Sequence, residues 1–326
     1  MKIYLVGGSV RDKLLNIVPQ DTDYLVVDAS EKDLIQRGLV KIGQTFPIYL
    51  NPENGDEYTL GQSLEEDLRR RDLTINAMAL DEKNELIDLF GGESDLRRKI
   101  LRHVSAENFF EDPLRVLRTA RFLSQLPEFS IHPETIKLMR EVGSSPQYKN
   151  LISERILKEL KRVFVSQKPS RFFETLKLIG GFEPFFKEIK VSLAGLDQFK
   201  GDEELSFSYL VTGLNLTELE VIAKRLNLQS NWKEKARAWI LSQVLSSDSP
   251  EGILEYFYQV DVFRKPQILE HVAALNCALG TKLSMLFSEL KDIGISDVKP
   301  ELHGKDIGLE IRRLRLMKLK TIIGNS

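Results

Sequence analysis

Residues 6–27 read VGGSVRDKLLNIVPQDTDYLVV, a stretch in which a glycine pair, an arginine and a D-x-D motif occur close together. The apolar run before the glycines predicts a strand, and SVRDKLL after them predicts a short helix. A strand that runs into Gly7 and Gly8 and then into a helix presents backbone N–H groups that can bind phosphate. Arg11, one turn into the helix, can reach the same phosphates. Taken alone, the glycine pair also fits a plain tight turn, and Arg11 also fits a surface ion pair. The G-x-G-x-x-G pattern of dinucleotide-binding proteins is absent.

The D-x-D motif lies at the start of a predicted strand, DTDYLVVD. Side chains alternate along a strand, so Asp21 and Asp23 should point to one face, where two carboxylates repel unless a cation lies between them. Hard oxygen ligands of this kind suit Mg²⁺ together with substrate phosphates. A third carboxylate often completes a two-metal site, and Glu57 is the better candidate, with Asp56 the weaker one. An exposed hairpin glutamate is the alternative for Glu57.

The element pattern changes near residue 94. Before it, short apolar runs alternate with turn signals: a helix capped by Ser30 and Asp33, strands at 39–43 and 46–50, a hairpin at Asn54-Gly55, a helix over 64–80, and a strand or turn at 85–92. After it, the periodicity is helical and is interrupted at prolines. The sequence predicts an α+β fold, with a small mixed-sheet head followed by an all-helical body. We expect domains at 1–95 (head), 96–190 (neck) and 191–326 (body and tail).

Composition indicates an ordinary globular protein, with 42% hydrophobic and 29% charged residues. Cys277 is the only cysteine, which excludes a disulfide framework and a cysteine-based zinc site. No uncharged stretch approaches the roughly 20 residues that a membrane span needs, and we expect a cytoplasmic protein. The net charge is −2, but residues 97–122 and 299–326 each hold seven Lys or Arg against three Asp or Glu. Such local basic clusters can bind a phosphate backbone, although a solvated surface explains each of them equally well.

Several motifs occur in a fixed order over residues 1 to 165. This arrangement resembles the class II tRNA nucleotidyltransferases, the CCA-adding enzymes, in a superfamily that also includes bacterial poly(A) polymerases. The segments that carry the resemblance are GGSVRDKLL, DTD, RRDLTINAMAL, EDPLRVLRTARF and ISERILKEL. The resemblance implies addition of C and A to a tRNA 3′ end from CTP and ATP, without a nucleic-acid template. It also implies two Mg²⁺ ions at the D-x-D motif, a tRNA partner, and neither a DNA nor a membrane partner.

The resemblance assigns four arginines to contacts with the incoming nucleotide. Two further residues are expected to support the pocket. Arg118 and Arg121, with Arg71 and Arg11, would contact its triphosphate or base, whereas solvation or ion pairing is the alternative for each of them. Arg70 is as basic as Arg71, and spacing does not choose between the two. We expect a pair four residues apart on the predicted helix to cap or brace the pocket: Asp72 and Asn76.

The segment EDPLR offers a physical route to nucleotide choice. Asp112 and Arg115 are three residues apart on a predicted helix, so both can face one pocket. Cytosine and adenine each present an amine donor beside a ring-nitrogen acceptor, which an aspartate and an arginine would match. Guanine and uracil present the opposite polarity, and a buried group left unpaired costs about 1–3 kcal/mol. A helix-surface ion pair is the alternative.

The sequence departs from the family in the segment before the RRD motif. Family members usually carry a longer, arginine-containing loop there, but DEYTL is followed only by GQS before LEEDL. In this family, loss of the loop accompanies addition of CC alone. The four histidines lack a following Asp, so we expect no metal-dependent phosphohydrolase activity. A poly(A) polymerase and a catalytically inactive RNA- or nucleotide-binding protein are the alternative functions.

Overall fold

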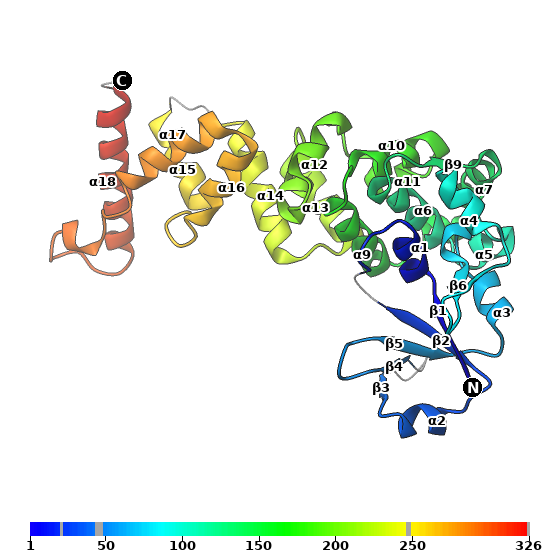
Figure 1. Cartoon of the computed structure of the whole chain (residues 1–326). Helices are drawn as coiled ribbons and strands as arrows, with labels where there is room; N and C mark the ends of the chain where they lie inside the picture. The colour runs from blue at the N-terminus through cyan, green and yellow to red at the C-terminus, as the bar shows by residue number, and fades with distance from the viewer. Residues whose placement is uncertain (20–21, 43–47, 246–248, 325–326) are drawn as a thin grey trace. The chain divides into compact units, whose positions relative to one another are not determined.

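The computed structural model describes residues 1–19, 22–42, 48–245 and 249–324. The chain divides into two compact units, one formed by Met1–Glu159 with Arg171–Glu183, the other by Leu160–Ser170 with Pro184–Ser326 (Figure 1). Asp21 lies outside the described residues, as do residues 43–47, which include the adjoining ends of the two strands expected at 39–43 and 46–50 and the residues between them. None of the helices in the described ranges is long and apolar enough to span a membrane.

The first unit contains a mixed sheet, which confirms the predicted α+β head. Its seven described strands lie in the order β3-β4-β5-β2-β1-β6-β7. The β2–β5 pair is parallel, and the other neighbouring pairs are antiparallel. The strands are β1 (Lys2–Val6), β2 (Asp23–Val27), β3 (Val40–Ile42), β4 (Ile48–Leu50), β5 (Glu57–Leu60), β6 (Met78–Leu80) and β7 (Leu86–Asp88).

Both faces of the sheet bury apolar side chains, because residues alternate along β2. Leu25 and Val27 pack with Leu68 of α3 (Leu64–Arg69), whereas Val26 packs on the other face with Leu34 of α2 (Glu31–Gln36). The side chain of Asp23 precedes Leu25 by two residues and therefore lies on the α3 face. The expected cap of α2 is confirmed, since Ser30 and Asp33 form a capping box. Between β1 and β2 lies α1 (Gly8–Leu14), as expected.

The single helix expected over residues 64–80 is wrong. The helix α3 ends at Arg69, a short 3₁₀ helix follows at Thr74–Asn76, and β6 then pairs with β1 and β7. Every residue from Leu73 to Leu80 is buried, so the segment has no exposed face of the kind a surface helix needs. Long-range partners hold the break in place: the Thr74 hydroxyl donates to Asp95 at 2.8 Å.

The rest of the first unit is mainly helical, with one exception that the sequence did not indicate. A two-stranded parallel sheet joins β8 (Ile100–Leu101) to β9 (Ser130–Ile131), and strands of two residues leave no periodic signal. Prolines begin two of the helices, as their positions predicted. The helices are α4 (Gly92–Arg97), α5 (Ala106–Glu111), α6 (Leu114–Gln125), α7 (Pro133–Ser144), α8 (Pro146–Lys149), α9 (Ser153–Phe164), α10 (Ser170–Ile179) and α11 (Glu183–Phe186). Of these, α9 and α11 continue into residues of the second unit, and the first residue of α10 belongs to that unit.

The second unit is helical throughout its described residues. One apolar cluster in this unit includes Trp239, Phe257, Leu269 and Leu283, all buried. The remaining helices are α12 (Glu203–Leu210), α13 (Leu216–Leu226), α14 (Ser230–Gln243), α15 (Pro250–Gln259), α16 (Gln267–Leu275), α17 (Cys277–Ser288) and α18 (Lys305–Gly324), with short 3₁₀ turns at Leu193–Phe199 and Ile295–Asp297.

Candidate active site

The glycine corner, Gly7 and Gly8 between β1 and α1, brings two arginines together. Gly7 has a φ of +76°, and a Cβ built on it would lie 2.2 Å from Nη1 of Arg71. A Cβ on Gly8 would lie 3.5 Å from Nη2 of Arg11. The absence of a side chain at Gly7 therefore permits both the left-handed backbone and the close approach of a guanidinium. Arg11 and Arg71 flank the corner, as their predicted role requires.

Ser9 links the glycine corner to the start of β2. This residue is buried in the first turn of α1, and its hydroxyl oxygen accepts a hydrogen bond of 3.3 Å from the backbone N–H of Asp23. The contact fixes where the D-x-D motif begins relative to the corner. Ser9 lies inside the motif that the sequence singled out, but serine after a glycine pair carries no separate signal of this contact.

Asp23 and Glu57 are direct neighbours in the sheet. They are register partners on the parallel strands β2 and β5, so their side chains project from the same face. Asp56 lies in the preceding turn, where its carboxylate accepts a hydrogen bond of 2.8 Å from the Asn54 side chain. No group of three or more acidic, His or Cys side chains arranged to hold a metal occurs in the described parts of the chain, which exclude Asp21. The structure thus brings Glu57, rather than Asp56, beside Asp23.

A buried carboxylate, Asp67, orients the arginines that follow it. Nε and Nη2 of Arg71 donate to Oδ2 of Asp67 at 3.0 and 2.7 Å, and Arg70 binds Oδ1 of the same carboxylate. Burial alone would raise the pKa of Asp67, but Arg71 and then Arg70 hold that pKa below its usual value. The Arg71 side chain is 20% exposed and the Arg70 side chain 59% exposed. Of these two arginines, Arg71 is the one that lies beside the Cβ position of Gly7.

A chain of polar contacts runs from Arg11 to Arg118 through Asn76 and Asp72. Nη1 of Arg11 donates to the Asn76 amide oxygen at 2.7 Å, and the Asn76 amide nitrogen donates to Asp72 at 2.9 Å. Arg118 donates to the other oxygen of Asp72 from Nε at 2.8 Å and contacts it from Nη2 at 2.7 Å. Burial would raise the pKa of Asp72, but Arg118 and Asn76 outweigh burial and hold that pKa far below its ordinary value. Asp72 and Asn76 therefore connect Arg11 with Arg118, two of the arginines that are predicted to contact the nucleotide.

Asp112 and Arg115 lie at a break between helices and not on one helix, which corrects the sequence-based expectation. Asp112 ends α5 with φ −131° and ψ 90°, because a residue before proline avoids the helical region and Pro113 follows it. Arg115 lies in the first turn of α6. The Asp112 carboxylate accepts a hydrogen bond of 2.8 Å from Nη2 of Arg155 on α9. The sequence did not indicate a role for Arg155.

The Arg115 guanidinium is half-buried, and its Nε atom is fully buried without a hydrogen-bond partner among the described residues. Burial lowers the pKa of this guanidinium, against the influence of Asp72 and Asp112. A buried donor without a partner costs free energy, so this atom suits an acceptor supplied by a ligand.

Arg121 is engaged inside the unit by a counter-charge of its own. It is buried, and its Nε atom donates to Glu159 of α9 at 2.5 Å, while its guanidinium lies 4.3 Å from the centre of the Phe122 ring. The opposite-charge partner therefore fixes Arg121 between α6 and α9. Glu159 lies in a segment that the sequence matched to the family, but its partner follows only from the packing of two helices.

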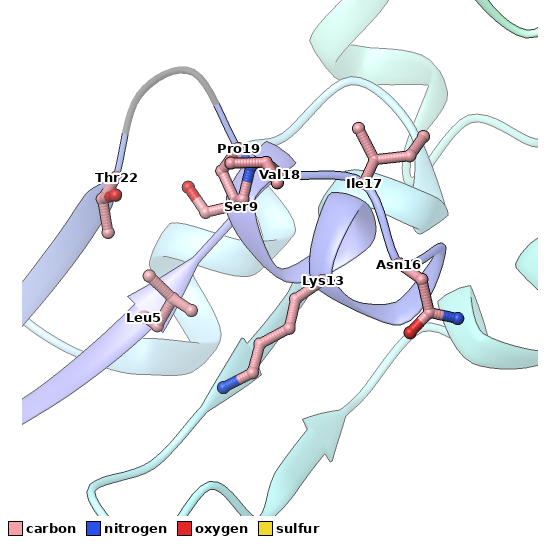
Figure 2. A pocket seen from close by; sticks show the side chains of 8 residues that line it. All are labelled: Leu5, Ser9, Lys13, Asn16, Ile17, Val18, Pro19 and Thr22. Carbon is pink, nitrogen blue, oxygen red and sulfur yellow. The ribbon is translucent and has the colours of Figure 1, made fainter.

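A cavity of about 370 Å³ lies beside α1, on the side of the sheet to which Leu5 projects (Figure 2). Leu5 is the register partner of Tyr24, which alternates with Asp23, so this side is opposite the Asp23 carboxylate. Its described lining residues are Leu5, Ser9, Lys13, Asn16, Ile17, Val18, Pro19 and Thr22. The cavity therefore adjoins the glycine corner at Ser9 and the residue before β2 at Thr22, on the face opposite the Asp23 carboxylate.

Comparison with known proteins identifies two matching family models and close relatives along the whole chain. The model described as "Poly A polymerase head domain" matches residues 40–102, and the one described as "Probable RNA and SrmB- binding site of polymerase A" matches residues 128–193. The CCA-adding enzyme of Coxiella burnetii is 32% identical over 367 aligned positions, covering 99% of this chain and 96% of the relative. That of Marinobacter nauticus is 33% identical, covering 98% of each chain. An alignment of 367 positions exceeds the 326 residues of the chain, so the Coxiella relative carries segments that the chain lacks.

Solved structures share the fold. One, described as a CCA-adding enzyme complex with ATP, superposes with a TM-score of 0.74 at 21% identity and covers 98% of this chain and 86% of that one. The Thermotoga maritima CCA-adding enzyme, solved in complex with tRNA, gives a TM-score of 0.69 at 20% identity, covering 99% and 90%. Together with the near full-length relatives, these findings show that the chain belongs to the class II CCA-adding enzymes, the family of tRNA nucleotidyltransferases.

Proposed function

We propose that this protein adds CCA to the 3′ end of tRNA from CTP and ATP without a nucleic-acid template. The observation that carries the proposal is the glycine corner flanked by Arg11 and Arg71, tied through Ser9 to Asp23, which has Glu57 beside it. Relatives that match nearly the whole chain are named CCA-adding enzymes, and solved structures of the same fold are described as complexes with ATP, CTP and tRNA. A poly(A) polymerase is less well supported, since it rests on the descriptions of the two family models.

Enzymes of this family generally use divalent metal ions, and the donor set here fits Mg²⁺. Asp23 and Glu57 present carboxylate oxygens from adjacent strands, and hard oxygen ligands are those that Mg²⁺ prefers. We assign the metal to Asp21 and Asp23, with Glu57 as the third catalytic carboxylate. When bound, the ions would activate the attacking hydroxyl and neutralise charge on the leaving group.

The triphosphate would lie against the glycine corner. Gly7 and Gly8 have no side chains to keep phosphate oxygens away from the backbone, and Arg11 and Arg71 supply positive charge from either side. Asp67 and Asn76 hold these two guanidinium groups in place. The arginines are thus ordered before the nucleotide binds, which reduces the entropy lost on binding.

Asp112 and Arg115 would select the base. The Asp112 carboxylate accepts from the exocyclic amine that cytosine and adenine share, and Arg115 donates to the ring nitrogen beside it. The unpartnered Nε of Arg115 supports this assignment, because an acceptor on the base removes a buried unsatisfied donor. Arg155 orients the Asp112 carboxylate, and Asp72 orients Arg118 beside the same helix turn.

In the reaction, the RNA 3′-hydroxyl oxygen attacks the α-phosphorus and loses its proton. The bond from the α-phosphorus to the bridging oxygen breaks, and pyrophosphate leaves with that oxygen. Arg11 and Arg71 stabilise the charge that develops on the departing phosphates, since fixed cations at a partly buried site need no reorganisation. The protein contributes mainly position and charge to this transfer.

The tRNA would be held outside the head, and the two basic segments named from the sequence differ in their suitability. Arg98 and Lys99 are exposed. By contrast, the basic residues of α18 are engaged within their own unit: Arg312 with Glu255, Arg313 with Glu310, Lys318 with Glu289 and Lys320 with Glu251, while Arg315 stacks on Phe263. Arg97 is likewise paired with Glu93, so we place the phosphate contacts at Arg98 and Lys99 in preference to α18.

A specific observation favours a second candidate, the addition of CC alone. The strand β5 ends at Leu60, and Ser63 already caps α3 by accepting a hydrogen bond of 3.2 Å from Glu66. Only Gly61, Gln62 and Ser63 join the two elements, and the Coxiella relative carries segments that this chain lacks. The longer loop that the family usually has at this point is absent, and its loss accompanies CC addition in the family.

Incubation of the protein with tRNA that lacks its 3′ terminus tests these functions. With CTP alone we expect two cytidines, and with CTP and ATP we expect a terminal adenosine after them. Products that end at CC with both nucleotides present would establish the second candidate. Repeated adenosine addition without cytidine would overturn both in favour of a poly(A) polymerase. Activity that survives the combined change of Asp21→Ala and Asp23→Ala would refute the catalytic assignment.

A further inference from the structure

Asn108 on α5 connects two parts of the nucleotide site that are far apart in sequence. Its side-chain amide nitrogen donates to the backbone carbonyl of Arg69 at 2.8 Å and to that of Arg71 at 2.9 Å. Because both neighbours are carbonyl oxygens, only the nitrogen of the amide can face them. Asn108 is 7% exposed, so neither hydrogen bond is readily replaced by solvent. The residue therefore clamps the peptide units on both sides of Arg70.

The same residue also holds Asp112 through its backbone. The carbonyl of Asn108 accepts a hydrogen bond of 3.1 Å from the N–H of Asp112, one helical turn later, where α5 ends. Ser105 caps the other end of this short helix by accepting from the N–H of Asn108 at 3.4 Å. One residue thus binds the segment that carries Arg71 with its side chain and the segment that carries Asp112 with its main chain.

We propose that Asn108 is a positioning residue that sets the distance between the triphosphate-binding arginine, Arg71, and the base-selecting carboxylate, Asp112. This inference rests on the proposed function, since it takes both roles from it. A nucleotide has a fixed separation between its phosphates and its base edge. With its phosphates held at the glycine corner, the base meets Asp112 only when the two protein segments keep the matching spacing, and small misplacements of positioned groups are costly.

Discrimination between bases depends on that spacing more than phosphate binding does. A displaced Asp112 makes a weaker hydrogen bond to the amine of cytosine, while its repulsion of the uracil carbonyl also weakens. Arg71 keeps its partner Asp67 and its contact with the glycine corner whether or not Asn108 donates to the carbonyls. Loss of the Asn108 side chain should therefore reduce the preference for CTP over UTP while leaving phosphate affinity largely unchanged.

The test compares Asn108→Ala and Asn108→Ser with the unaltered protein on tRNA that lacks its 3′ terminus. We expect the ratio of kcat/KM for CTP to that for UTP to fall about tenfold in Asn108→Ala, the effect of about one lost hydrogen bond to the discriminating geometry. Asn108→Ser, whose hydroxyl oxygen takes the place of the amide carbon and falls short of both carbonyls, should behave like Asn108→Ala. Inhibition by inorganic tripolyphosphate, a probe of the phosphate side alone, should change less than threefold in either variant.

Thr175→Val is the matched control, because it removes a buried side-chain donor to a backbone carbonyl at 2.6 Å in the same unit, on α10. It should leave the CTP to UTP ratio unaltered, whatever its effect on the melting temperature. An equal loss for CTP and UTP in Asn108→Ala would overturn the proposal and leave Asn108 a merely structural residue. Weaker tripolyphosphate inhibition with the ratio intact would also overturn it. Failure of the proposed function looks different, since the unaltered protein would then add no cytidine at all.

Discussion

The guanidinium of Arg71 lies where a side chain of residue 7 would be, only 2.2 Å from the position of a Cβ on Gly7. These residues belong to a turn after the first strand and to the segment after α3, and they meet because β6 pairs with β1. The backbone N–H of Gly7 donates to the carbonyl of Met78, the first residue of β6, at 3.2 Å. The left-handed backbone of Gly7 and the close contact with Arg71 therefore depend on the same strand pairing.

Gly7→Ala should impair activity far more than it impairs folding. The alanine methyl group displaces the Arg71 guanidinium from the corner, and we expect kcat/KM for CTP and ATP to fall at least about a hundredfold. The control is Gly91→Ala, since Gly91 has a φ of +77° with nothing within 4 Å of its Cβ position. Gly91→Ala should cost about 1–2 kcal/mol in denaturant unfolding, because Gly91 has a left-handed α conformation with a ψ of 25°. Gly7 combines its positive φ with a ψ of −137°, a conformation that essentially only glycine adopts, so Gly7→Ala should destabilise the fold more. Equal activity in the two would show that the contact with Arg71 has no catalytic consequence.

Arg71→Lys should raise KM for both nucleotides, because lysine cannot reproduce the two-pronged contact with Asp67 that orients the side chain. We expect an increase of roughly tenfold or more, measured by steady-state kinetics. Arg70→Lys is the control at the neighbouring position, where the side chain is mostly exposed, and KM should change by less than about threefold. A larger rise in KM for Arg70→Lys than for Arg71→Lys would assign the phosphate contact to Arg70.

Glu57→Gln should increase the Mg²⁺ concentration needed for half-maximal activity and lower the maximal rate at least about tenfold, since an amide is a weaker ligand and carries no charge. Removal of divalent ions with a chelator should abolish activity in the unaltered protein. Asp56→Asn keeps the turn contact with Asn54 possible and should leave the metal requirement unchanged. A larger effect at Asp56 than at Glu57 would reassign the third carboxylate.

Asp72→Asn should destabilise the protein by about 1.5–3 kcal/mol at pH 7, because it removes the buried carboxylate that pairs with the partly exposed Arg118 guanidinium. The pKa of Asp72 is depressed in the folded state, so its contribution is complete above the ordinary aspartate value of about 3.9 and is lost as the pH falls through the folded pKa. Urea unfolding should show a difference between the two proteins that is constant from pH 7 to 5 and shrinks below about pH 4. A difference that grows on acidification would contradict this electrostatic account.

Variants of Arg121 test whether this residue acts through the packing of the core or through a direct contact with the nucleotide. Arg121→Met should lower the free energy of unfolding by about 3–5 kcal/mol, because it leaves Glu159 buried without its partner. The double variant with Glu159→Leu should recover much of that loss. KM for CTP should stay within about threefold in the double variant if Arg121 acts only through the packing of α6 on α9. A tenfold rise in KM despite recovered stability would restore the direct nucleotide contact expected from the sequence.

Local signals in the sequence were sufficient where the structure is local. The turn at Gly7-Gly8, the cap of α2 and the hairpin before Glu57 form as expected, because turn residues and capping side chains act within a few positions. The helix expected over residues 64–80 failed because its apolar residues are buried from every side. Periodicity in the sequence cannot distinguish one long buried helix from a short helix followed by a buried strand.

The sequence by itself determined the strand, glycine corner, helix and D-x-D strand, and with them the family, because these features are short and their chemistry is carried by neighbouring residues. Only the tertiary structure decided that Arg71 lies beside the Cβ position of Gly7, that Arg121 is buried with Glu159, and that Asn108 binds the segment of Arg71. These choices depend on partners far away in the sequence: Asn108 and Arg71 are 37 residues apart, and Arg121 and Glu159 are 38 residues apart. Spacing along a chain does not encode which of several equivalent side chains the packed elements bring within hydrogen-bond distance.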